Sequence, residues 1–254
     1  MSSLKIEERG IQAKIANVYT NVRRACKTSS LFYDYWDDLF VKNLNAEANS
    51  IILDLGCGTG FLLKRLHEEG YNYLVGLDIT LEMLREAKSL LGNTVDLVLA
   101  DAEKLPFRDR SLDAILCCGT LHHIPQFRKT VSEISRSLKE NGILILSETN
   151  ESLVLKPLRF FLKSSGKFSE AHRAFPLVKL KTVLVENSFS ISKQSYFGYL
   201  AFALLGFPDI LSITRYIPTK IARLLILLDK FLSKTPLLSR FSWHIFIVAR
   251  LRVP

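Results

Sequence analysis

Apolar residues in the first 150 positions fall into short continuous runs separated by segments of helical period. Five such runs predict buried strands: Ile51–Leu55, Tyr73–Asp78, Val95–Ala100, Leu112–Cys118 and Ile143–Leu146. Between them, helical spacing predicts helices at 61–66, 81–91 and 127–139, with Thr80 as the cap of the second and Asn141-Gly142 as the turn that ends the third. Strands that alternate with helices predict a doubly wound, parallel α/β sheet.

The flanking segments follow different patterns. Residues 12–45 have helical period, with Ile15, Val18, Tyr19 and Val22 on one face. Beyond Glu148 the pattern predicts a helix at 175–187, a strand at 190–197 and a final strand at 243–251. We therefore divide the chain into a helical N-terminal cap (1–48), a sheet domain (49–198 and 243–254) and an inserted segment (199–242).

A glycine-rich turn follows the first predicted strand. Asp54 is followed by Gly56, Gly58 and Gly60, and then by a segment of helical period. Glycines let the backbone turn tightly and leave no Cβ between it and a ligand, while the start of the helix directs free N–H groups towards the same place. The turn therefore predicts a binding site for a nucleotide-like cofactor.

The residues around this turn distinguish between cofactors. A nicotinamide or flavin site has the spacing GxGxxG, whereas this chain has GxGxG. Asp54 would repel a pyrophosphate but suits the cationic amino-acid end of a ligand. Asp78, at the end of the second strand, is suited to two ribose hydroxyls, and Asp101 with Ala102, after the third strand, to the amine and ring of adenine.

Together these segments resemble the class I S-adenosylmethionine-dependent methyltransferases, of the type 11 kind that includes the quinone C-methyltransferases. The resemblance covers residues 50–150 and rests on the motifs ILDLGCGTG, VGLDIT, LADAEKLPFRDRSLDAI, LHHI and LKENGILILSE. It implies a Rossmann-like, mostly parallel seven-stranded sheet of order 3-2-1-4-5-7-6 with an antiparallel last strand. It also implies S-adenosylmethionine as the cofactor, with a set of contact residues: Asp54, Gly56, Cys57, Gly58, Gly60, Asp78, Ile79, Asp101, Ala102 and Cys118.

Several of these residues have a purely structural interpretation as well. A single carboxylate at a strand end is more often a turn residue than a ligand contact, but three at successive strand ends favour a site. Cys57 reads as a small packing residue rather than a nucleophile, and Cys117 with Cys118 as small apolar residues that end a buried strand. Asp113 is expected to order the loop before the fourth strand.

Candidates for acid–base chemistry lie just past the fourth and fifth strands. A sulfonium methyl is already activated, so the main task is positioning the nucleophile in line, and a general base adds rate only where the acceptor must lose a proton. His122 and His123 are the candidate catalytic residues and Glu148 is a further candidate. The alternative is that the histidines only hold the loop. Tyr19 and Tyr33 either close over the cofactor or serve as core aromatics.

Charge is distributed unevenly along the chain. Residues 1–150 carry 18 Lys and Arg against 20 Asp and Glu, while residues 151–254 carry 16 against 5. Residues 196–207 are uncharged, too few to span a bilayer, and a helix after Pro218 combines one apolar face (Ile221, Leu224, Leu225, Leu228, Phe231, Leu232) with basic residues. Residues 157–163 repeat this pattern on a smaller scale. The segment is interpreted as a lid, or as a lid that also contacts a membrane or lipid-like substrate; nucleic acid is the weaker alternative.

We therefore expect a methyltransferase acting on oxygen or carbon of a small, apolar or lipid-linked acceptor. The alternatives are an RNA methyltransferase and a non-catalytic cofactor-binding protein. Four scattered cysteines indicate neither a disulfide framework nor a zinc site, and no metal is expected. The first nine residues hold no apolar stretch, so we expect no secretory signal and a cytoplasmic, membrane-associated location.

Overall fold

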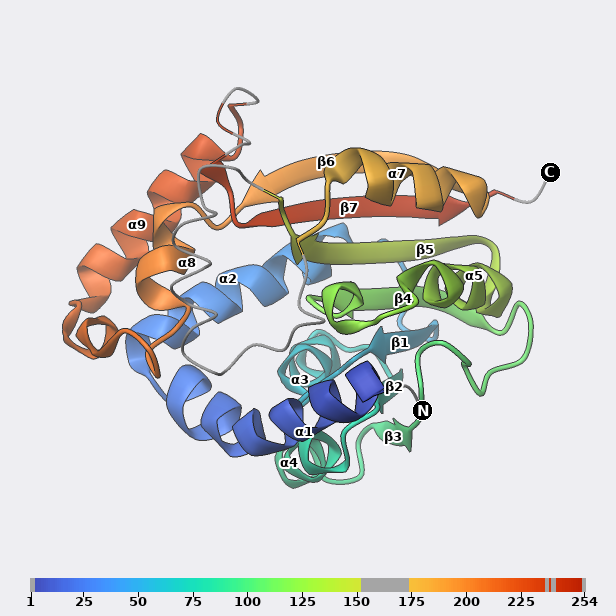
Figure 1. Ribbon diagram of the computed structural model, residues 1–254, viewed down its shortest axis with the longest axis horizontal. Coiled ribbons are helices and arrows are strands. Elements are labelled where there is room, and N and C mark those ends of the chain that lie inside the picture. Colours follow the sequence, from blue (N-terminus) through green and yellow to red (C-terminus); the bar gives the residue numbers. More distant parts are fainter. Residues whose placement is uncertain (1–2, 152–173, 236–237, 239–240, 253–254) are drawn as a thin grey trace.

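The protein, described here from a computed structural model, is built on one seven-stranded sheet of order β3-β2-β1-β4-β5-β7-β6 (Figure 1). The structure describes residues 3–151, 174–235, 238 and 241–252. Its strands are β1 (Ile51–Leu55), β2 (Tyr73–Asp78), β3 (Asp96–Leu99), β4 (Leu112–Cys118), β5 (Leu138–Thr149), β6 (Phe189–Phe197) and β7 (His244–Leu251). The first five strands are parallel, and β7 pairs antiparallel with both β5 and β6. The predicted strand order and the antiparallel last strand are confirmed.

Both faces of the sheet are covered, which explains why its strands read as continuous apolar runs. Successive strand residues point to opposite faces. In β4, Ala114 and Leu116 join one apolar cluster, and Ile115 and Cys117 join the other. The helices of the first cluster are α2 (Lys27–Asn43), α3 (Phe61–Glu68), α4 (Leu81–Leu91), α8 (Leu200–Leu205) and α9 (Thr219–Leu232). Those of the second are α5 (Phe127–Ser137) and α7 (Leu177–Glu186).

The N-terminal cap consists of more elements than the sequence predicted. Helix α1 (Ser3–Val18) begins nine residues before the predicted start and continues into a π-helical segment, Tyr19–Arg24. A break at Cys26, whose backbone is extended, then separates this segment from α2. The helical period predicted at 12–45 is therefore confirmed for most of these residues, but it is divided among α1, the π-helical segment and α2, which ends at Asn43.

The fifth strand is longer than its apolar run. Helix α5 ends at Ser137 rather than at 139, and Leu138 already pairs with Leu112 in the parallel ladder of β4 and β5. Asn141 and Gly142, predicted as the turn after the helix, lie within β5, where Asn141 has a positive φ of 60°. At its other end, β5 runs to Thr149 and so includes Glu148 in the sheet.

The inserted segment 199–242 is helical in its described part, with α8, a 3₁₀ turn (Ser212–Tyr216) and α9. These elements lie together at one end of the sheet in Figure 1, beside α2. The buried residues of α9 are Ala222, Ile226 and Asp229. Most of the predicted apolar face of this helix is exposed, and only Leu225 and Leu232 of it are half-buried. The apolar–basic pattern at 157–163 lies outside the described residues.

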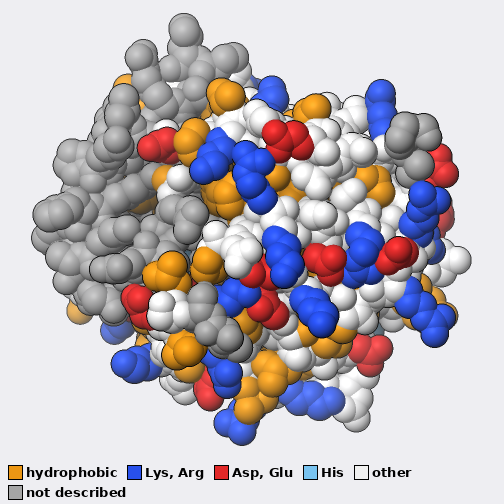
Figure 2. All heavy atoms as spheres, turned by 45° about the vertical axis from the view of Figure 1, so that its right-hand side comes forward, with side chains coloured by type: hydrophobic (Ala, Val, Ile, Leu, Met, Phe, Trp, Pro, Cys, Tyr) orange, Lys and Arg blue, Asp and Glu red, His pale blue; other side chains and the backbone are white. Residues whose placement is uncertain are grey.

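Charged side chains are well mixed on another part of the surface. Figure 2 shows a face on which Lys and Arg side chains lie among Asp and Glu side chains, with apolar ones scattered between them. Scattered exposed apolar residues are ordinary for a globular protein. The exposed charged residues of α9, by contrast, are all Lys or Arg.

Candidate active site

A cavity of about 770 Å³ opens at the carboxyl ends of the central strands. Its walls include residues from the ends of β1, β2 and β4 and from the N-terminal cap. The strand order reverses between β1 and β4, and in open α/β sheets ligands bind in the crevice at such a point. Of the predicted cofactor contacts and catalytic candidates, all but Gly60 and Glu148 line this cavity: Asp54, Gly56, Cys57, Gly58, Asp78, Ile79, Asp101, Ala102, Cys118, His122 and His123.

The glycine turn forms the floor of the cavity beside β1. Gly56 and Gly58 have φ angles of +74° and +52°, in the left-handed region that disfavours a side chain. A Cβ on Gly56 would lie 2.3 Å from the Thr120 side chain, so the turn after β1 packs directly on the loop after β4. A Cβ on Gly58 would meet no protein atom within 4 Å, because this glycine faces open space.

Gly60 is the predicted cofactor contact that does not line the cavity. It stands at the start of α3, where an added Cβ would lie 2.8 Å from Leu91 Cδ1 and 3.1 Å from Ala87 Cβ. Gly60 therefore permits the close packing of α3 on α4. The sequence pattern could not distinguish this packing role from contact with a ligand.

Asp54 is a buried carboxylate without a hydrogen-bond partner. Its residue is 1% exposed, and neither carboxylate oxygen has a protein partner. Burial, together with the charges of Asp37 and Asp78, raises the pKa of the Asp54 carboxyl to about 8. A buried acceptor is costly unless a donor reaches it, so a cationic ligand group beside Asp54 would supply the missing donor and favour the ionised form.

Asp78 holds the glycine turn from the end of β2. Its Oδ2 accepts a hydrogen bond from the Gly58 amide at 3.0 Å, and its Oδ1 accepts one from the Thr80 amide at 2.8 Å. Burial raises its pKa, and these amides oppose the rise. Thr80 occupies the cap position of α4 as predicted, but its side chain makes no capping hydrogen bond.

Asp101 is engaged by a lysine from the N-terminal helix. Lys5 Nζ lies 2.5 Å from Asp101 Oδ2 and 2.7 Å from Glu103 Oε2, and Asp101 Oδ1 accepts the Glu103 amide at 2.9 Å. The carboxylate expected to meet an adenine amine thus also anchors α1. Nothing in the sequence spacing marked Lys5, because it lies 96 residues away from Asp101.

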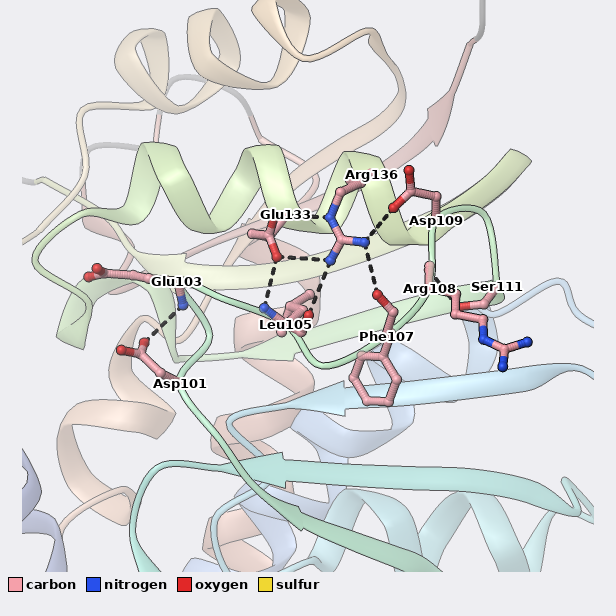
Figure 3. Close-up of polar contacts among 9 residues, drawn as sticks. All are labelled: Asp101, Glu103, Leu105, Phe107, Arg108, Asp109, Ser111, Glu133 and Arg136. Carbon is pink, nitrogen blue, oxygen red and sulfur yellow. Dashed lines mark hydrogen bonds and ion pairs between the residues drawn. The ribbon is translucent and has the colours of Figure 1, made fainter.

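The loop after β3 is fixed to α5 by one arginine (Figure 3). Arg136 donates to the Leu105 carbonyl at 3.1 Å and to the Phe107 carbonyl at 2.8 Å, while pairing with Glu133 and Asp109. Glu133 in turn accepts the Leu105 amide at 2.8 Å. This network holds the loop that carries Asp101 and Ala102 against the cavity.

Glu148 organises the turn after β4. It is fully buried, and its Oε1 accepts the amides of Thr120 at 3.1 Å and Leu121 at 2.8 Å. Its Oε2 lies 2.7 Å from His122 Nδ1 and 3.2 Å from the His122 amide. Burial raises the pKa of Glu148 to about 7 against the lowering effect of these amides and of His123. His122 is therefore held by a buried carboxylate at the wall of the cavity.

His123 has a different neighbour. Its Nδ1 lies 2.8 Å from Oε1 of Glu8, a buried residue of α1. The adjacent histidines thus diverge in role: His122 contacts the sheet through Glu148, and His123 contacts the cap. The sequence predicted that both histidines lie at the site but did not distinguish their roles.

The cap contributes residues that the sequence interpretation missed. Arg24 forms an ion pair with Asp37 at 2.7 Å, while its buried Nε has no partner, and both residues line the cavity. Arg23, Tyr19 and Tyr33 line it too. Arg24 lies two residues after Val22, off the apolar face of the predicted helix, so the helical spacing gave no signal for it.

The cysteines at the site are buried thiols. Cys57 and Cys118 line the cavity, and burial raises the thiol pKa of each well above its ordinary value. Such thiols are protonated at neutral pH and are poor nucleophiles. Asp113, predicted to order a loop, instead accepts the Ile51 amide at 2.9 Å and pairs with Lys139 at 2.8 Å. In the described part of the chain, no group of three or more His, Cys, Asp or Glu residues is placed to hold a metal ion.

The fold and this cavity define a Rossmann-like α/β protein with a ligand site at the reversal of strand order. The model of the methyltransferase domain family matches residues 53–146. A ubiquinone/menaquinone biosynthesis C-methyltransferase from Rickettsia bellii is 30% identical over 175 residues, which cover 62% of this chain and 70% of that protein. The chain therefore belongs to the class I S-adenosylmethionine-dependent methyltransferases, and its cofactor is S-adenosylmethionine.

Two further relatives extend the comparison. An uncharacterized protein from Methanocaldococcus jannaschii is 44% identical over 126 residues, 48% of this chain, but the chain spans only 45% of its length. The structure of phosphoethanolamine N-methyltransferase 2 from Haemonchus contortus, solved in complex with S-adenosylmethionine, has a TM-score of 0.63 and 14% identity. It covers 94% of this chain, which covers 60% of it, and at this identity it shows the shared fold alone.

The residues at the cavity fit the cofactor. Asp54 offers two unpartnered acceptor oxygens to an ammonium group, and the Nε of Arg24 offers a buried donor to a carboxylate. Gly58 leaves room beside the turn. An α-amino acid end carries both of these charges, so this part of the cavity is complementary to the methionine portion of the cofactor.

Proposed function

We propose that the protein transfers the cofactor's methyl group to an oxygen or carbon of a small, apolar or lipid-linked acceptor. The observation that carries the proposal is that one cavity is lined both by His122, which the buried Glu148 holds from behind, and by an aromatic wall. S-adenosylmethionine supplies an electrophilic methyl group on a sulfonium. The residues of the chain then have to hold the cofactor, orient the acceptor and remove its proton.

The cofactor contacts are proposed as follows. Asp54 would hold the ammonium group and Arg24 the carboxylate, while Asp78 would hold the ribose and Asp101 with Ala102 the adenine. Gly56, Gly58, Cys57, Ile79 and Cys118 would make contact by packing, since each lines the cavity. For Gly60 we propose support of the turn through α3 instead of direct contact.

The acceptor side of the cavity is aromatic. Its lining includes six aromatic side chains from four parts of the chain: Tyr19, Tyr33, Trp36, Phe202, Phe207 and Trp243. Arg23 is paired with Asp209 at 3.0 Å and lies over the rings of Tyr19 and Phe207. Arg24 is paired with Asp37 and lies over the ring of Tyr33. A neutralised, ring-lined chamber favours an apolar or aromatic acceptor over a phosphate-rich one.

His122 is the proposed general base. Glu148 holds His122 through Nδ1, so a proton from an acceptor hydroxyl or activated carbon would pass to Nε2, with Glu148 stabilising the resulting imidazolium. His123, which contacts Glu8, is proposed to hold the cap rather than to act as the base. This assignment applies where the acceptor loses a proton during transfer.

A labelling experiment tests the reaction class. Purified protein, S-adenosylmethionine with a labelled methyl group and a fractionated cell extract are incubated, and label is counted in the lipid extract and in total RNA. Label in the lipid fraction supports the proposal. Label confined to RNA, or tight cofactor binding with no transfer to any fraction, would replace it with one of the two alternatives considered from the sequence.

Single-turnover kinetics test the base. His122→Ala is expected to lower the transfer rate by about 10²–10⁴-fold while the affinity for S-adenosylhomocysteine is retained. His123→Ala, its neighbour in the same turn, is the matched control and is expected to have the smaller effect on the rate. Equal rates for His122→Ala and the unaltered protein would contradict the role of His122.

The four thiols support a proposal about the cellular setting. All four cysteines are free in the structure. We therefore place the protein in a reducing compartment such as the cytosol, where free thiols persist.

A further inference from the structure

Helix α9 presents a row of exposed apolar side chains. Ile221, Leu224, Leu227, Leu228 and Phe231 are each 39–69% exposed, and we refer to them as the α9 apolar face. The same helix buries only Ala222, Ile226 and Asp229. These residues recur at helical spacing, so the helix contacts the protein along a narrow seam and directs its large apolar residues outward.

The exposed charges beside this face have a single sign. Lys220, Arg223, Lys230 and Lys234 are all exposed. The two acidic residues of the segment 199–242 are turned inward: the Asp209 side chain is 5% exposed and pairs with Arg23, and Asp229 is fully buried. Among the described residues of this segment, the exposed charges are therefore all positive, unlike the mixed face in Figure 2.

The positions of these residues around the helix are typical of a helix that lies in a membrane interface. At 3.6 residues per turn, the apolar face is centred opposite the buried seam. Arg223 and Lys230 lie at one edge of this face and Lys220 lies within it, while Lys234 follows the end of the helix at Leu232. Apolar residues that face the acyl chains, with basic residues at their border, suit this arrangement. Within the described ranges, no helix has the length and hydropathy needed to cross a bilayer.

We propose that the α9 apolar face docks on the surface of an anionic lipid bilayer. A second copy of the chain is the less suitable occupant, because a self-complementary contact places this face against itself and brings four exposed cations of one copy towards those of the other. An anionic bilayer accepts the apolar residues and neutralises the cations together. Charge complementarity thus favours lipid.

The docking face is mechanically connected to the cavity. Asp229 of α9 accepts the amides of Tyr199, Leu200 and Ala201, at 2.8, 3.0 and 3.3 Å, and so fixes the start of α8. Helix α8 carries Phe202, which lines the cavity, and Leu200, which is 48% exposed. Docking by α9 would therefore place the aromatic wall of the cavity close to the bilayer. This inference rests on the proposed lipid-linked acceptor and adds how such an acceptor would reach the cavity.

Vesicle sedimentation tests the docking face. The full chain is mixed with vesicles of phosphatidylcholine alone, or of two parts phosphatidylcholine to one part phosphatidylglycerol, at low and high salt. We expect binding to the anionic vesicles at low salt and release as salt rises. Leu224→Ser with Phe231→Ser should lower the partition coefficient by about tenfold or more. Lys220→Gln with Arg223→Gln should lower it by about fivefold for each charge, the equivalent of about 1 kcal/mol each.

Matched controls come from the other side of the sheet. Val178 and Val185 of α7 are 76% and 64% exposed, and Lys129 and Lys181 are exposed on α5 and α7. Val178→Ser with Val185→Ser, and Lys129→Gln with Lys181→Gln, should leave vesicle binding nearly unchanged. Failure of the unaltered protein to bind anionic vesicles at low salt, or an equal loss in the controls, would overturn the proposal.

Two further measurements separate this proposal from its alternatives. Sedimentation equilibrium without lipid should give the same mass for the unaltered protein and for Leu224→Ser with Phe231→Ser. A dimer that this pair dissociates would assign the face to self-association instead. Binding of S-adenosylhomocysteine by all variants shows that the site is intact, so that loss of vesicle binding is distinguished from failure of the proposed methyl transfer.

Discussion

His122 Nδ1 lies 2.7 Å from Oε2 of Glu148, a residue 26 positions further along the chain and fully buried in β5. The contact joins the turn after β4 to the neighbouring strand, because β4 and β5 run parallel and bring Cys118 opposite Ser147. It gives one of the two adjacent histidines a carboxylate partner at the cavity wall. A buried carboxylate that orients an imidazole is a recurring arrangement in general-base catalysis.

Replacing this carboxylate should alter the rate and its pH dependence. Burial raises the pKa of Glu148 to about 7, so the carboxylate gains its charge, and its ability to stabilise an imidazolium, as pH rises through this value. We expect kcat for methyl transfer to increase with pH up to about 7 and to stay constant above it. Glu148→Gln should lower kcat and flatten this rise. Glu151→Gln, which alters a carboxylate that does line the cavity, is the control and should keep the profile.

Asp54 should make cofactor affinity depend on pH. Its pKa of about 8 means that the free protein carries this carboxyl protonated at neutral pH, whereas an ammonium group requires the ionised form. Affinity for S-adenosylhomocysteine should therefore rise by about tenfold per pH unit below 8. Above about 8 the affinity should level off, and it should fall only when the ligand's own amino group loses its proton at higher pH. Titration calorimetry from acid to alkaline pH measures both limbs.

The same titration has an internal control. Asp54→Asn should weaken binding of S-adenosylhomocysteine and remove the acid limb. Binding of methylthioadenosine, which lacks the amino-acid end, should be unaffected by the substitution. A pH profile for Asp54→Asn identical to that of the unaltered protein would contradict the assignment.

The Asp54 carboxyl also determines the direction in which the free energy of unfolding changes with pH. Its pKa is raised on folding from the ordinary 3.8, so the folded state binds more protons than the unfolded state between these values. The free energy of unfolding of the ligand-free protein should therefore decrease as pH rises from about 4 to about 8 on account of this group. Denaturant titrations of the unaltered protein and of Asp54→Asn should converge at the acid end, where the carboxyl is neutral in both states.

Glycine substitutions should separate binding from folding. Ala in place of Gly58 or Gly70 adopts a left-handed φ at each position, costing about 1–2 kcal/mol, and meets no protein atom within 4 Å at either. Of these two glycines, Gly58 lines the cavity and Gly70 does not. We expect similar losses of Tm in both variants, with S-adenosylhomocysteine affinity reduced by about tenfold or more in Gly58→Ala alone. Equal affinities would show that Gly58 is not a contact residue.

Lys5 should control the attachment of the N-terminal helix. Burial lowers its pKa, but hydrogen bonds and charges from Asp101 and Glu103 raise it overall, so the ammonium ion is retained in this contact. In Lys5→Met the backbone amides of α1 should exchange faster with deuterated water while those of the sheet are unchanged. Lys14→Met, at an exposed position of the same helix, should leave the exchange of α1 as it was.

The central sheet was predictable because its signals are local. Strands buried on both faces must be apolar throughout, and the glycine turn requires residues without a Cβ; both requirements leave a pattern in consecutive residues. The predicted ends of helices and strands were wrong where a contact with another part of the chain determines them. Leu138 leaves the helical period because Leu112 pairs with it, and at Cys26 an extended backbone separates two helical segments that the sequence pattern did not divide.

The sequence by itself determined the order of the central elements and the strand ends at which Asp54, Asp78 and His122 meet, because parallel strands bring their carboxyl ends to one edge whatever surrounds them. Only the tertiary structure decided which histidine has Glu148, that Lys5 holds Asp101, and that Gly60 packs against α4 rather than lining the cavity. It also turned the leucines of α9 outward. Each of these depends on contacts between residues distant in the chain, and such contacts leave no period or motif in the sequence.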